Sequence, residues 1–426
     1  MRSDGILIIG TGQAGVELAA ALRSAEYTGP ITLVGSEARA PYQRPPLSKG
    51  WLAGAQTADS IDLRSPQWFA ANAIELITGD AVVDVARDGA AAGTATLSSG
   101  RTIPFDRLAL ATGAEARMLD CPGSALPGVH YLRNTAHADA LALELANAKS
   151  VVVVGGGFIG LEVAVAARKH GANVTIVEAA PRLIGRAVAE QTSEFYPNAH
   201  HRRGLQILTG AKVEGIEEFD GRIAGVRLAA SGKNPATVVP AEVVVVGIGV
   251  VPSTAVAEAL GLVIANGVVV DERMLASDGS TVVVGDCSNM PLPGGARGSI
   301  DRVRLESVPN AAEQARVAAA TLTGAAATYE AIPWFWSDQG ELKLQIAGLS
   351  HGYDRTVLRG DPESEKFSLL YYRGEALIAA DCINSPRDFI AVKNALKRGL
   401  GLDAASAADV SIPLKDLVRQ ATAVLV

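Results

Sequence analysis

Two copies of one glycine pattern are the residues in this sequence best suited to chemistry. Each copy has the spacing G-x-G-x-x-G, directly after four aliphatic residues and directly before an alanine-rich stretch. The glycines are Gly10, Gly12 and Gly15 in the first copy and Gly155, Gly157 and Gly160 in the second, 145 residues later. This spacing is typical of a loop that receives the pyrophosphate of a dinucleotide.

Each glycine of the pattern is required for a structural reason. The first allows a tight turn from strand to helix, the second lets a pyrophosphate approach the backbone, and the third lets the helix pack closely on the strand. The helix that follows presents free N–H groups and the positive end of its dipole. Glu37 and Glu178 end the next apolar segments, 22 and 18 residues after the third glycine, where a ribose hydroxyl needs an acceptor. Two such loops in one chain predict a flavin and a nicotinamide nucleotide.

The elements that must position these loops follow from the apolar pattern. Runs without alternation, such as 6–9 and 151–154, predict strands buried on both faces of a parallel sheet. From Ala327 the chain becomes aromatic and alternating, which predicts an antiparallel sheet with helices after Pro386. The predicted fold class is α/β, with two Rossmann-like dinucleotide-binding domains and an α+β C-terminal domain.

We expect three domains. Residues 1–111 and 248–327 form a discontinuous first dinucleotide-binding domain, 112–247 form the second, and 328–426 form a C-terminal α+β domain.

Composition narrows the function classes. The formal charge of −7 disfavours non-specific binding to nucleic acid or anionic membrane. The longest uncharged run, 243–257, is broken by two glycines and Pro252, so we expect no membrane span. We expect no signal peptide, because an apolar strand is predicted from Ile6, and three widely spaced cysteines suit a reducing cytoplasm. Neither these cysteines nor the six histidines have metal-ligand spacing, so we expect no metal.

The chain resembles the FAD-dependent NADH:ferredoxin reductases, the putidaredoxin reductase type within the glutathione-reductase-like fold. The resemblance covers essentially the whole chain. Its specific motifs are Pro41–Lys49 (PYQRPPLSK) and Pro333–Gln339 (PWFWSDQ). Motifs shared more widely are the two glycine patterns, Ala111–Ala114 (ATGA), Gly247–Pro252 (GIGVVP), Gly285-Asp286 and Glu306–Ala311 (ESVPNA).

The resemblance implies which residues hold each nucleotide. For FAD they are Gly10, Gly12, Gly15, Glu37, Arg44, Lys49, Ala111, Thr112, Gly113, Asp286, Ser307, Val308 and Trp336. For NADH they are Gly155, Gly157, Phe158, Ile159, Gly160, Glu162, Glu178 and Gly249. Asp286 could instead cap a helix, and Arg44 could be a solvated loop residue.

The resemblance further implies a catalytic role for Lys49, Glu162 and Trp336. We hypothesise that Lys49 pairs with Glu162 and orients the nicotinamide over the flavin. The alternatives are an exposed loop lysine and an acid that stabilises the helix dipole, because we expect Glu162 in the first helical turn. Trp336 is expected beside the flavin edge where electrons leave, although tryptophans in a short strand commonly fill a core.

The implied reaction is hydride transfer from NADH to FAD, then two single-electron transfers to a [2Fe–2S] ferredoxin that serves a cytochrome P450 or a ring-hydroxylating oxygenase. Pro41–Lys49 contains no cysteine, so no thiol relay is expected. An acidic ferredoxin requires a locally basic docking face, for which the candidates are Arg297, Arg302, Arg304 and Arg316.

Alternatives remain at this stage. One is an NADH-dependent reductase of rubredoxin or of a small molecule, and another is a flavin-based redox sensor. Glu178 is followed by Ala179 and Ala180 rather than arginine, which favours NADH over NADPH, with Arg182 close enough to leave NADPH open.

Overall fold

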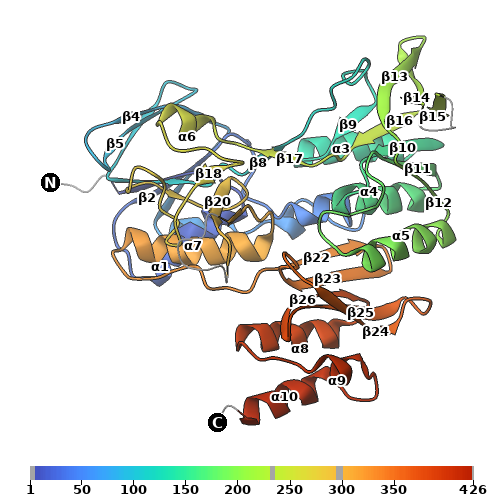
Figure 1. Cartoon of the computed structure of the whole chain (residues 1–426). Helices are drawn as coiled ribbons and strands as arrows, with labels where there is room; N and C mark the ends of the chain where they lie inside the picture. The colour runs from blue at the N-terminus through green and yellow to red at the C-terminus, as the bar shows by residue number, and fades with distance from the viewer. Residues whose placement is uncertain (1–4, 231–235, 294–300, 425–426) are drawn as a thin grey trace. The chain divides into compact units, whose positions relative to one another are not determined.

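The structure, a computed structural model, describes residues 5–230, 236–293 and 301–424 (Figure 1). The chain forms two compact units. Unit 1 comprises Met1–Gln43, Ala58–Glu115 and Val251–Pro333, and unit 2 comprises Arg44–Thr57, Ala116–Val250 and Trp334–Val426. This division differs from the three domains expected from the sequence, whose boundaries stay predictions.

Unit 1 is built on a parallel five-stranded sheet in the order β19-β7-β1-β2-β3. The strands are β1 (Ile6–Ile9), β2 (Ile31–Gly35), β3 (Ile74–Thr78), β7 (Arg107–Leu110) and β19 (Val282–Val283). All four residues of β1 are buried, which explains its unbroken aliphatic run. Helices α1 (Gln13–Ser24) and α7 (Val308–Leu322) lie side by side (Figure 1) and share one core with the sheet.

Smaller elements complete unit 1. An antiparallel sheet joins its core through Ala95, Leu97, Ile103 and Phe105. Its strands are β4 (Val82–Arg87), β5 (Gly93–Leu97) and β6 (Thr102–Phe105). The other elements are α2 (Pro66–Ala71), α6 (Ala255–Ala259), η2 (Asp59–Ile61), β18 (Val268–Val269), β20 (Ser288–Pro291) and β21 (Arg302–Val303).

Unit 2 repeats this plan, as the duplicated glycine pattern predicts. Its parallel sheet has the order β12-β11-β10-β16-β9, so the strand before each glycine loop lies at the centre with its two successors on one side. The strands are β9 (Val129–Tyr131), β10 (Ser150–Val154), β11 (Asn173–Glu178), β12 (Leu205–Thr209) and β16 (Val243–Val246). Three helices and a second antiparallel sheet belong to this half: α3 (Thr135–Leu145), α4 (Phe158–Lys169), α5 (Glu190–Arg202), β13 (Val213–Phe219), β14 (Arg222–Leu228) and β15 (Thr237–Pro240).

The C-terminal part of unit 2 is an antiparallel sheet in the order β22-β23-β26-β25-β24. Its strands are β22 (Trp334–Gln339), β23 (Leu342–Gly348), β24 (Arg355–Asp361), β25 (Lys366–Arg373) and β26 (Ala376–Ile383). One face shares a core with α4 and α5, and the other packs on helices α8 (Pro386–Lys397), α9 (Ala404–Ala408) and α10 (Leu414–Val424). The predicted antiparallel sheet and the helix beginning at Pro386 are both confirmed.

Two further short elements complete the description. Strands β8 (Ala114–Ala116) and β17 (Val250–Pro252) pair where the chain passes between the units. The 3-10 turn η1 (Pro45–Ser48) belongs to unit 2, and the nearby Leu52 is part of the core of α4. In the described ranges, no helix is long and apolar enough to cross a bilayer.

A buried arginine fastens the last helices of unit 2. Arg359 on β24 is 6% exposed and pairs with Asp388 of α8 at 3.1 Å. Its guanidinium also donates to the carbonyls of Ala407, Asp409 and Ile412, which form the connection from α9 to α10. One side chain therefore satisfies a carboxylate and three backbone acceptors.

We expect Arg359→Met to lower the free energy of unfolding by about 3 kcal/mol, because it leaves Asp388 without its cation inside the protein. Urea unfolding followed by circular dichroism measures the change. Arg355→Met is the matched control: Arg355 lies on the same strand and is exposed, with surface contacts to Glu375 at 3.5 Å, to the Gly374 carbonyl at 3.3 Å and to the Tyr372 ring. The control should change the stability by less than about 0.5 kcal/mol. Equal effects of the two variants would contradict the role given to Arg359.

Candidate nucleotide and redox site

The first glycine loop packs against the turn that follows β7. Gly10 has a φ of +120°, and a Cβ there would lie 2.1 Å from the carbonyl oxygen of Ala111. Gly15 is equally constrained, because its Cβ would lie 1.9 Å from the oxygen of Gly10. Two hydrogen bonds with Ser253 fix the Ala111–Gly113 turn. The Thr112 hydroxyl donates to the Ser253 carbonyl at 2.6 Å, and the Ser253 N–H donates to the Gly113 carbonyl at 3.0 Å. The structure thus brings the glycines and the predicted ATGA turn together.

The start of α1 is shaped for an anion. Gly12 is its N-cap, and no described side chain caps this helix end, whereas Ser307 caps α7 and Asn134 caps α3. A Cβ on Gly12 would meet no described atom within 4 Å. Free N–H groups beside open space are what a pyrophosphate requires, so the residues present fit a dinucleotide.

The second glycine loop has the same geometry. Gly155 has a φ of +110°, and its Cβ would lie 2.4 Å from the carbonyl oxygen of Gly247. The Cβ of Gly160 would lie 2.1 Å from the oxygen of Gly155. Gly157 is the N-cap of α4, again without a capping bond from any described side chain, and the nearest atom to its Cβ position is 4.0 Å away. Gly249, with a φ of +100°, lies in the turn after β16.

The two predicted ribose acids are held differently. Glu178 is the last residue of β11, and its two carboxylate oxygens accept from the N–H groups of Gly156 and Ala180, both at 2.6 Å. Glu37 lies two residues beyond the end of β2 and accepts from the Tyr42 hydroxyl at 2.6 Å. Both carboxylates are therefore held in one orientation, and that of Glu178 contacts its glycine loop directly.

Asp286 lies in a turn that approaches the start of α1, because a Cβ on the preceding Gly285 would come within 2.8 Å of the Ala14 methyl group. The buried amide of Gln314 on α7 fixes this turn by accepting from the Gly285 N–H at 2.7 Å and the Ser288 hydroxyl at 3.0 Å. The alternative that Asp286 caps a helix is wrong, since strand β20 follows it. Sequence reasoning missed Gln314, because nothing in a helix sequence marks one glutamine as the partner of a distant turn.

Ser307 and Val308 occupy the N-terminus of α7. The Ser307 hydroxyl accepts from the Asn310 N–H at 3.3 Å as the helix cap, and Val308 is the first helical residue and is half-buried.

A buried carboxylate gathers residues of unit 2 that were predicted to have a catalytic role. Glu162 on α4 is 5% exposed and accepts from Lys49 at 2.8 Å, so the predicted ion pair is present. The Ser48 hydroxyl donates to the same oxygen at 2.5 Å, and the Ser337 hydroxyl donates to the other at 2.6 Å. The Lys49 ammonium also donates to the Pro45 carbonyl at 3.2 Å. These bonds fix the lysine and the carboxylate in one arrangement.

One detail of the prediction for Glu162 is wrong. Helix α4 begins at Phe158, so Glu162 is its fifth residue, beyond the first turn, where the dipole has little effect on an acid. The dipole alternative therefore does not explain the residue. Ser48 and Ser337 were missed by the sequence analysis, although each lies inside a motif that carries the family resemblance.

Strand β22 presents its two faces to different partners. Phe335 packs on Phe158 of α4 with ring centroids 4.6 Å apart, and Ser337, on the same face, reaches Glu162. Trp336 points the other way because strand side chains alternate. Its ring lies 5.5 Å from that of Trp334, which is covered by Lys393 at 4.2 Å. Trp336 is thus half-buried on the face of β22 opposite to the carboxylate.

The remaining predicted residues of unit 2 lie near η1 and the start of α4. Arg44 precedes η1 and donates to the Arg133 carbonyl at 2.6 Å. Ile159, in the first turn of α4, is 42% exposed. The residues predicted for FAD are divided between the units, with Arg44, Lys49 and Trp336 in unit 2 and the others in unit 1.

The cysteines are not arranged for redox chemistry. All three lie in the described ranges and carry free thiols. Cys287 and Cys382 are fully buried, and burial raises the pKa of both thiols and of the half-buried Cys121. A thiol with a raised pKa is a poor nucleophile. Over the residues described, no group of three or more His, Cys, Asp and Glu is placed to hold a metal ion.

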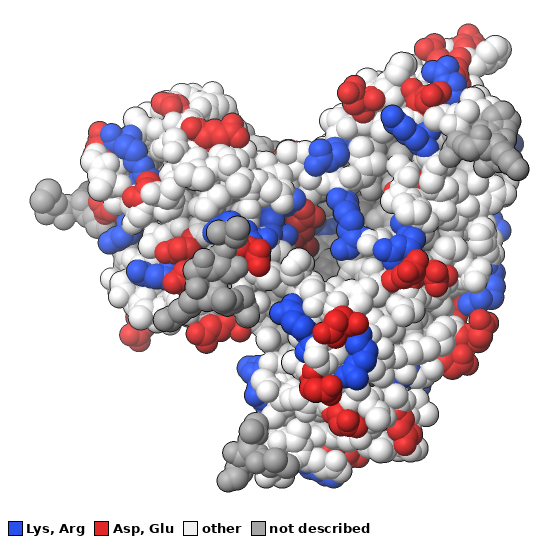
Figure 2. All heavy atoms as spheres, viewed as in Figure 1, with Lys and Arg blue, Asp and Glu red and all other residues white. Residues whose placement is uncertain are grey.

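Three of the four arginines proposed for a docking face are engaged within unit 1. Arg302 donates to the carbonyls of Val270 and Asn289. The side chain of Arg304 is 9% exposed and pairs with Glu306 at 2.6 Å. Arg316 pairs with Glu313 at 2.5 Å, and Arg297 lies outside the described residues. On the face drawn in Figure 2, acidic and basic side chains are interspersed.

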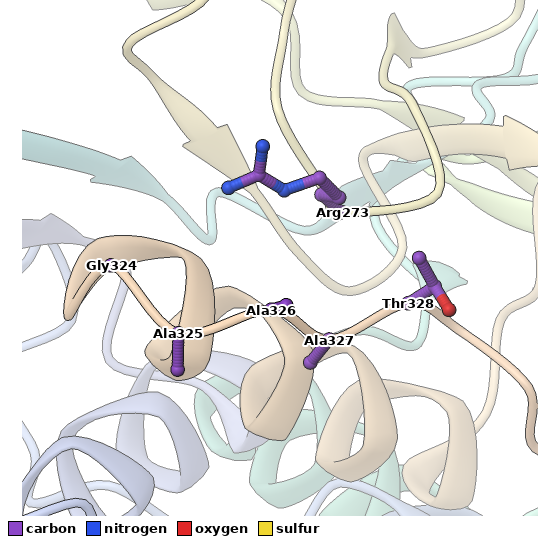
Figure 3. Close-up of a pocket in the computed structure, with 6 residues that line it drawn as sticks. All are labelled: Arg273, Gly324, Ala325, Ala326, Ala327 and Thr328. Atoms are coloured by element: carbon purple, nitrogen blue, oxygen red, sulfur yellow. The ribbon is translucent and has the colours of Figure 1, made fainter.

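A separate cavity of about 250 Å³ lies at the other end of α7 (Figure 3). It is lined by Arg273 and by the small residues 324–328 that follow the helix, with the arginine side chain lying over that segment. Since α7 has 15 residues, its two ends are about 22 Å apart. The cavity is therefore far from Ser307 and lacks the aromatic lining of a typical cofactor site.

Comparison with known proteins gives consistent matches. Residues 4–315 match the family described as pyridine nucleotide-disulphide oxidoreductase, and residues 334–418 match the reductase C-terminal family. Rhodocoxin reductase of Rhodococcus erythropolis is 45% identical over 96% of this chain and 93% of its own length.

Two solved structures are also similar. The ferredoxin reductase for the CYP199A2 system of Rhodopseudomonas palustris is 39% identical with a TM-score of 0.91, over 98% of this chain and 100% of that one. The reductase in the covalent putidaredoxin reductase–putidaredoxin complex is 38% identical with a TM-score of 0.91, over 99% of this chain and 100% of that one.

The Glu162 cluster makes a prediction about stability. Lys49→Met leaves a buried carboxylate with hydroxyl donors only, so we expect the free energy of unfolding to fall by about 3 kcal/mol. In the double variant Lys49→Met/Glu162→Gln the neutral amide no longer needs a cation, and at least half of the loss should be recovered. Urea unfolding of the three proteins measures this. Lys343→Met, on the exposed side of β23, is the control and should unfold like the wild type. A double variant less stable than Lys49→Met would contradict the interpretation.

Proposed function

Because the chain belongs to the pyridine nucleotide-disulphide oxidoreductase family, and within it to the ferredoxin reductases, we propose that it is an FAD-containing, NADH-dependent ferredoxin reductase. Membership confirms the resemblance and the glutathione-reductase-like fold expected from the sequence. The observation that carries the proposal is the presence of two glycine loops, each at the carboxyl edge of its own parallel sheet. The helix that follows each loop has no capping bond from a described side chain.

We assign FAD to the loop of unit 1. Its support is the clear space at Gly12, the oriented carboxylate of Glu37 for a ribose, and the Asp286 turn held against α1. Gln314 contributes by fixing that turn. The capping bond of Ser307 gives α7 a defined first turn, and its N–H groups are further donors for the nucleotide.

We assign NADH to the loop of unit 2. Glu178 is fixed at the end of β11 by two backbone N–H groups, so its negative charge has a defined position beside the glycine loop. A carboxylate there accepts from ribose hydroxyls and repels a 2′-phosphate. Arg182 donates to the carbonyl of Gly185 in its own loop at 3.5 Å. The proposal therefore includes a preference for NADH over NADPH.

Lys49 and Glu162 are the residues that we assign to the redox centre. When bound, FAD supplies the conversion between the two-electron chemistry of NADH and the one-electron chemistry of an iron–sulfur centre. Glu162 holds the Lys49 side chain in one orientation, and the ammonium supplies a fixed positive charge in a poorly solvated place. Trp336, with its ring packed beside Trp334, is assigned to the exit side of the centre.

The electron acceptor in this proposal is a [2Fe–2S] ferredoxin that serves a cytochrome P450 or an oxygenase. Support comes from two similar proteins, one described as the reductase of a P450 system and one solved in complex with putidaredoxin. The buried thiols argue against a disulfide relay. We also propose a cytoplasmic location, since a reducing compartment keeps three unpaired cysteines as thiols.

The direct test is anaerobic reduction of the reconstituted holoprotein. We expect NADH to bleach the visible flavin absorbance and the reduced protein to transfer electrons to an added [2Fe–2S] ferredoxin, with a rate that falls as salt is raised. NADPH should be at least about tenfold less effective in kcat/KM, which corresponds to about 1.4 kcal/mol. Lys49→Met should slow flavin bleaching by at least about tenfold.

The acceptor panel separates the alternatives. Faster reduction of rubredoxin or of a small quinone than of any ferredoxin would replace the proposed acceptor. Rapid bleaching with no competent acceptor would indicate a redox sensor. A holoprotein whose flavin stays oxidised under excess NADH would refute the proposal.

The two glycine loops allow a reciprocal test of the cofactor assignment. A Cβ at Gly12 or at Gly157 touches little protein, so Gly12→Ala and Gly157→Ala should both fold. Gly12→Ala should weaken retention of FAD by at least about tenfold, because its methyl group takes the space of the pyrophosphate. Gly157→Ala should keep FAD and raise the half-saturating NADH concentration by a similar factor. Flavin released on ultrafiltration and stopped-flow titration measure the two effects, and the opposite pattern would reverse the assignment.

A further inference from the structure

A buried pair on the C-terminal sheet holds the loop that adjoins the second glycine pattern. We propose that Tyr371 and Asp381 are positioning residues for the 179–189 loop, so that the C-terminal sheet sets how tightly the pyridine nucleotide binds. This inference rests on the proposal that the loop of unit 2 binds NADH. All of the residues involved belong to unit 2.

The 179–189 loop runs from Glu178 to the start of α5 and contacts the glycine loop directly. The Ile184 N–H donates to the carbonyl of Gly156 at 2.9 Å. A Cβ on Gly156 would lie 2.4 Å from the Leu183 side chain, so the two segments touch. Any displacement of this loop must therefore move the residues on which the nucleotide pyrophosphate depends.

The loop needs external support. Ile184 has a φ of +44°, a left-handed conformation that is unfavourable for a β-branched residue. Such a residue keeps this conformation only where its surroundings determine it. One support comes from helix α5, which follows the loop: the Ser193 hydroxyl donates to the Leu183 carbonyl at 2.5 Å.

The second support comes from the C-terminal sheet. The Tyr371 hydroxyl on β25 accepts from the N–H of Ala189, the last residue of the loop, at 2.8 Å. Ala189 is also the N-cap position of α5, where its own side chain cannot bond. Tyr371 is fully buried, so no water can replace this bond at little cost.

Asp381 on β26 completes the arrangement by accepting from the Tyr371 hydroxyl. It is 1% exposed, and the groups that face it are Tyr371 from β25 and Thr192 and Tyr196 from α5, none of which is a cation. Burial raises the pKa of Asp381 to about 7, while Tyr371 and Thr192 oppose the shift. An ionised Asp381 polarises the phenol and strengthens the bond that Tyr371 accepts from Ala189.

Stability does not explain why an acid occupies this position. The stability contributed by a raised carboxyl pKa is fully present below about pH 4, the ordinary range of the group, and is lost as the pH rises through about 7. An ionised Asp381 at neutral pH therefore destabilises the fold. What the ionised Asp381 strengthens is the hydrogen bond from the Ala189 N–H to the Tyr371 hydroxyl, which joins the C-terminal sheet to the 179–189 loop.

The test compares two adjacent buried tyrosines in the FAD-loaded protein. Tyr371→Phe removes the bond to Ala189. Tyr372→Phe is the matched control, because Tyr372 is also fully buried but faces α8–α10 and its hydroxyl has no partner among the residues described. We expect Tyr371→Phe to raise the half-saturating NADH concentration for flavin reduction three- to tenfold with a limiting rate within twofold, and Tyr372→Phe to match the wild type.

Two further readouts separate positioning from a general loss of stability. Hydrogen–deuterium exchange of the nucleotide-free protein should be faster over 183–190 in Tyr371→Phe only. Between pH 8 and pH 6 the half-saturating NADH concentration of the wild type should rise at least threefold as Asp381 takes up its proton, and Asp381→Asn should show no such rise.

The outcomes are distinct. Wild-type NADH affinity together with wild-type exchange in Tyr371→Phe would overturn the inference, as would an unchanged pH profile in Asp381→Asn. A wild-type protein whose flavin NADH does not reduce would instead refute the proposed function, and the exchange comparison would still report on the anchor.

Discussion

One buried carboxylate, that of Glu162, determines how the residues of unit 2 that we assign to the redox centre are arranged. It accepts from Lys49 and Ser48 of the proline-rich segment and from Ser337 of the C-terminal sheet. A carboxylate that is 5% exposed requires such donors, because leaving it unpaired inside the protein is strongly unfavourable. Three segments far apart in the sequence must therefore meet at α4, and this requirement places residues 44–57 in the same unit as the nucleotide helix.

The sequence predicted the repeated architecture well because that architecture is local. Four aliphatic residues, a glycine loop and a helix recur in each copy, and the strand order around them is the same in both units. The predicted start of α4 was wrong because the pattern does not say which glycine is the cap. The second glycine, Gly157, has extended backbone angles and caps the helix, so the third, Gly160, is already helical and Glu162 is the fifth helical residue.

Most contacts between distant segments could not be predicted, and the one that was, between Lys49 and Glu162, came from the family resemblance and not from the pattern itself. Because side chains alternate along a strand, Trp336 and Ser337 are expected on opposite faces of β22, but the sequence does not tell which face meets α4. Gln314 and Asp381 look like ordinary polar residues in an apolar helix and strand, and only the folded chain shows what each of them contacts. In both cases a buried polar side chain is defined by a partner that a single sequence does not reveal.

The two nucleotide loops are nearly identical in backbone, so what distinguishes them must lie in the strands and connections around them. The edge strand two places from the strand that precedes each loop illustrates this. In unit 1 that strand is β19, and it leads to the acidic turn of Asp286. In unit 2 the corresponding strand is β9, and it leads to Arg133, whose carbonyl binds the guanidinium of Arg44. The same position in the repeat thus leads to an acidic residue in one unit and to a carbonyl that binds an arginine in the other. Since both glycine loops offer the same N–H groups to a pyrophosphate, any difference in the nucleotides that they bind must arise from such neighbours and not from the loops themselves.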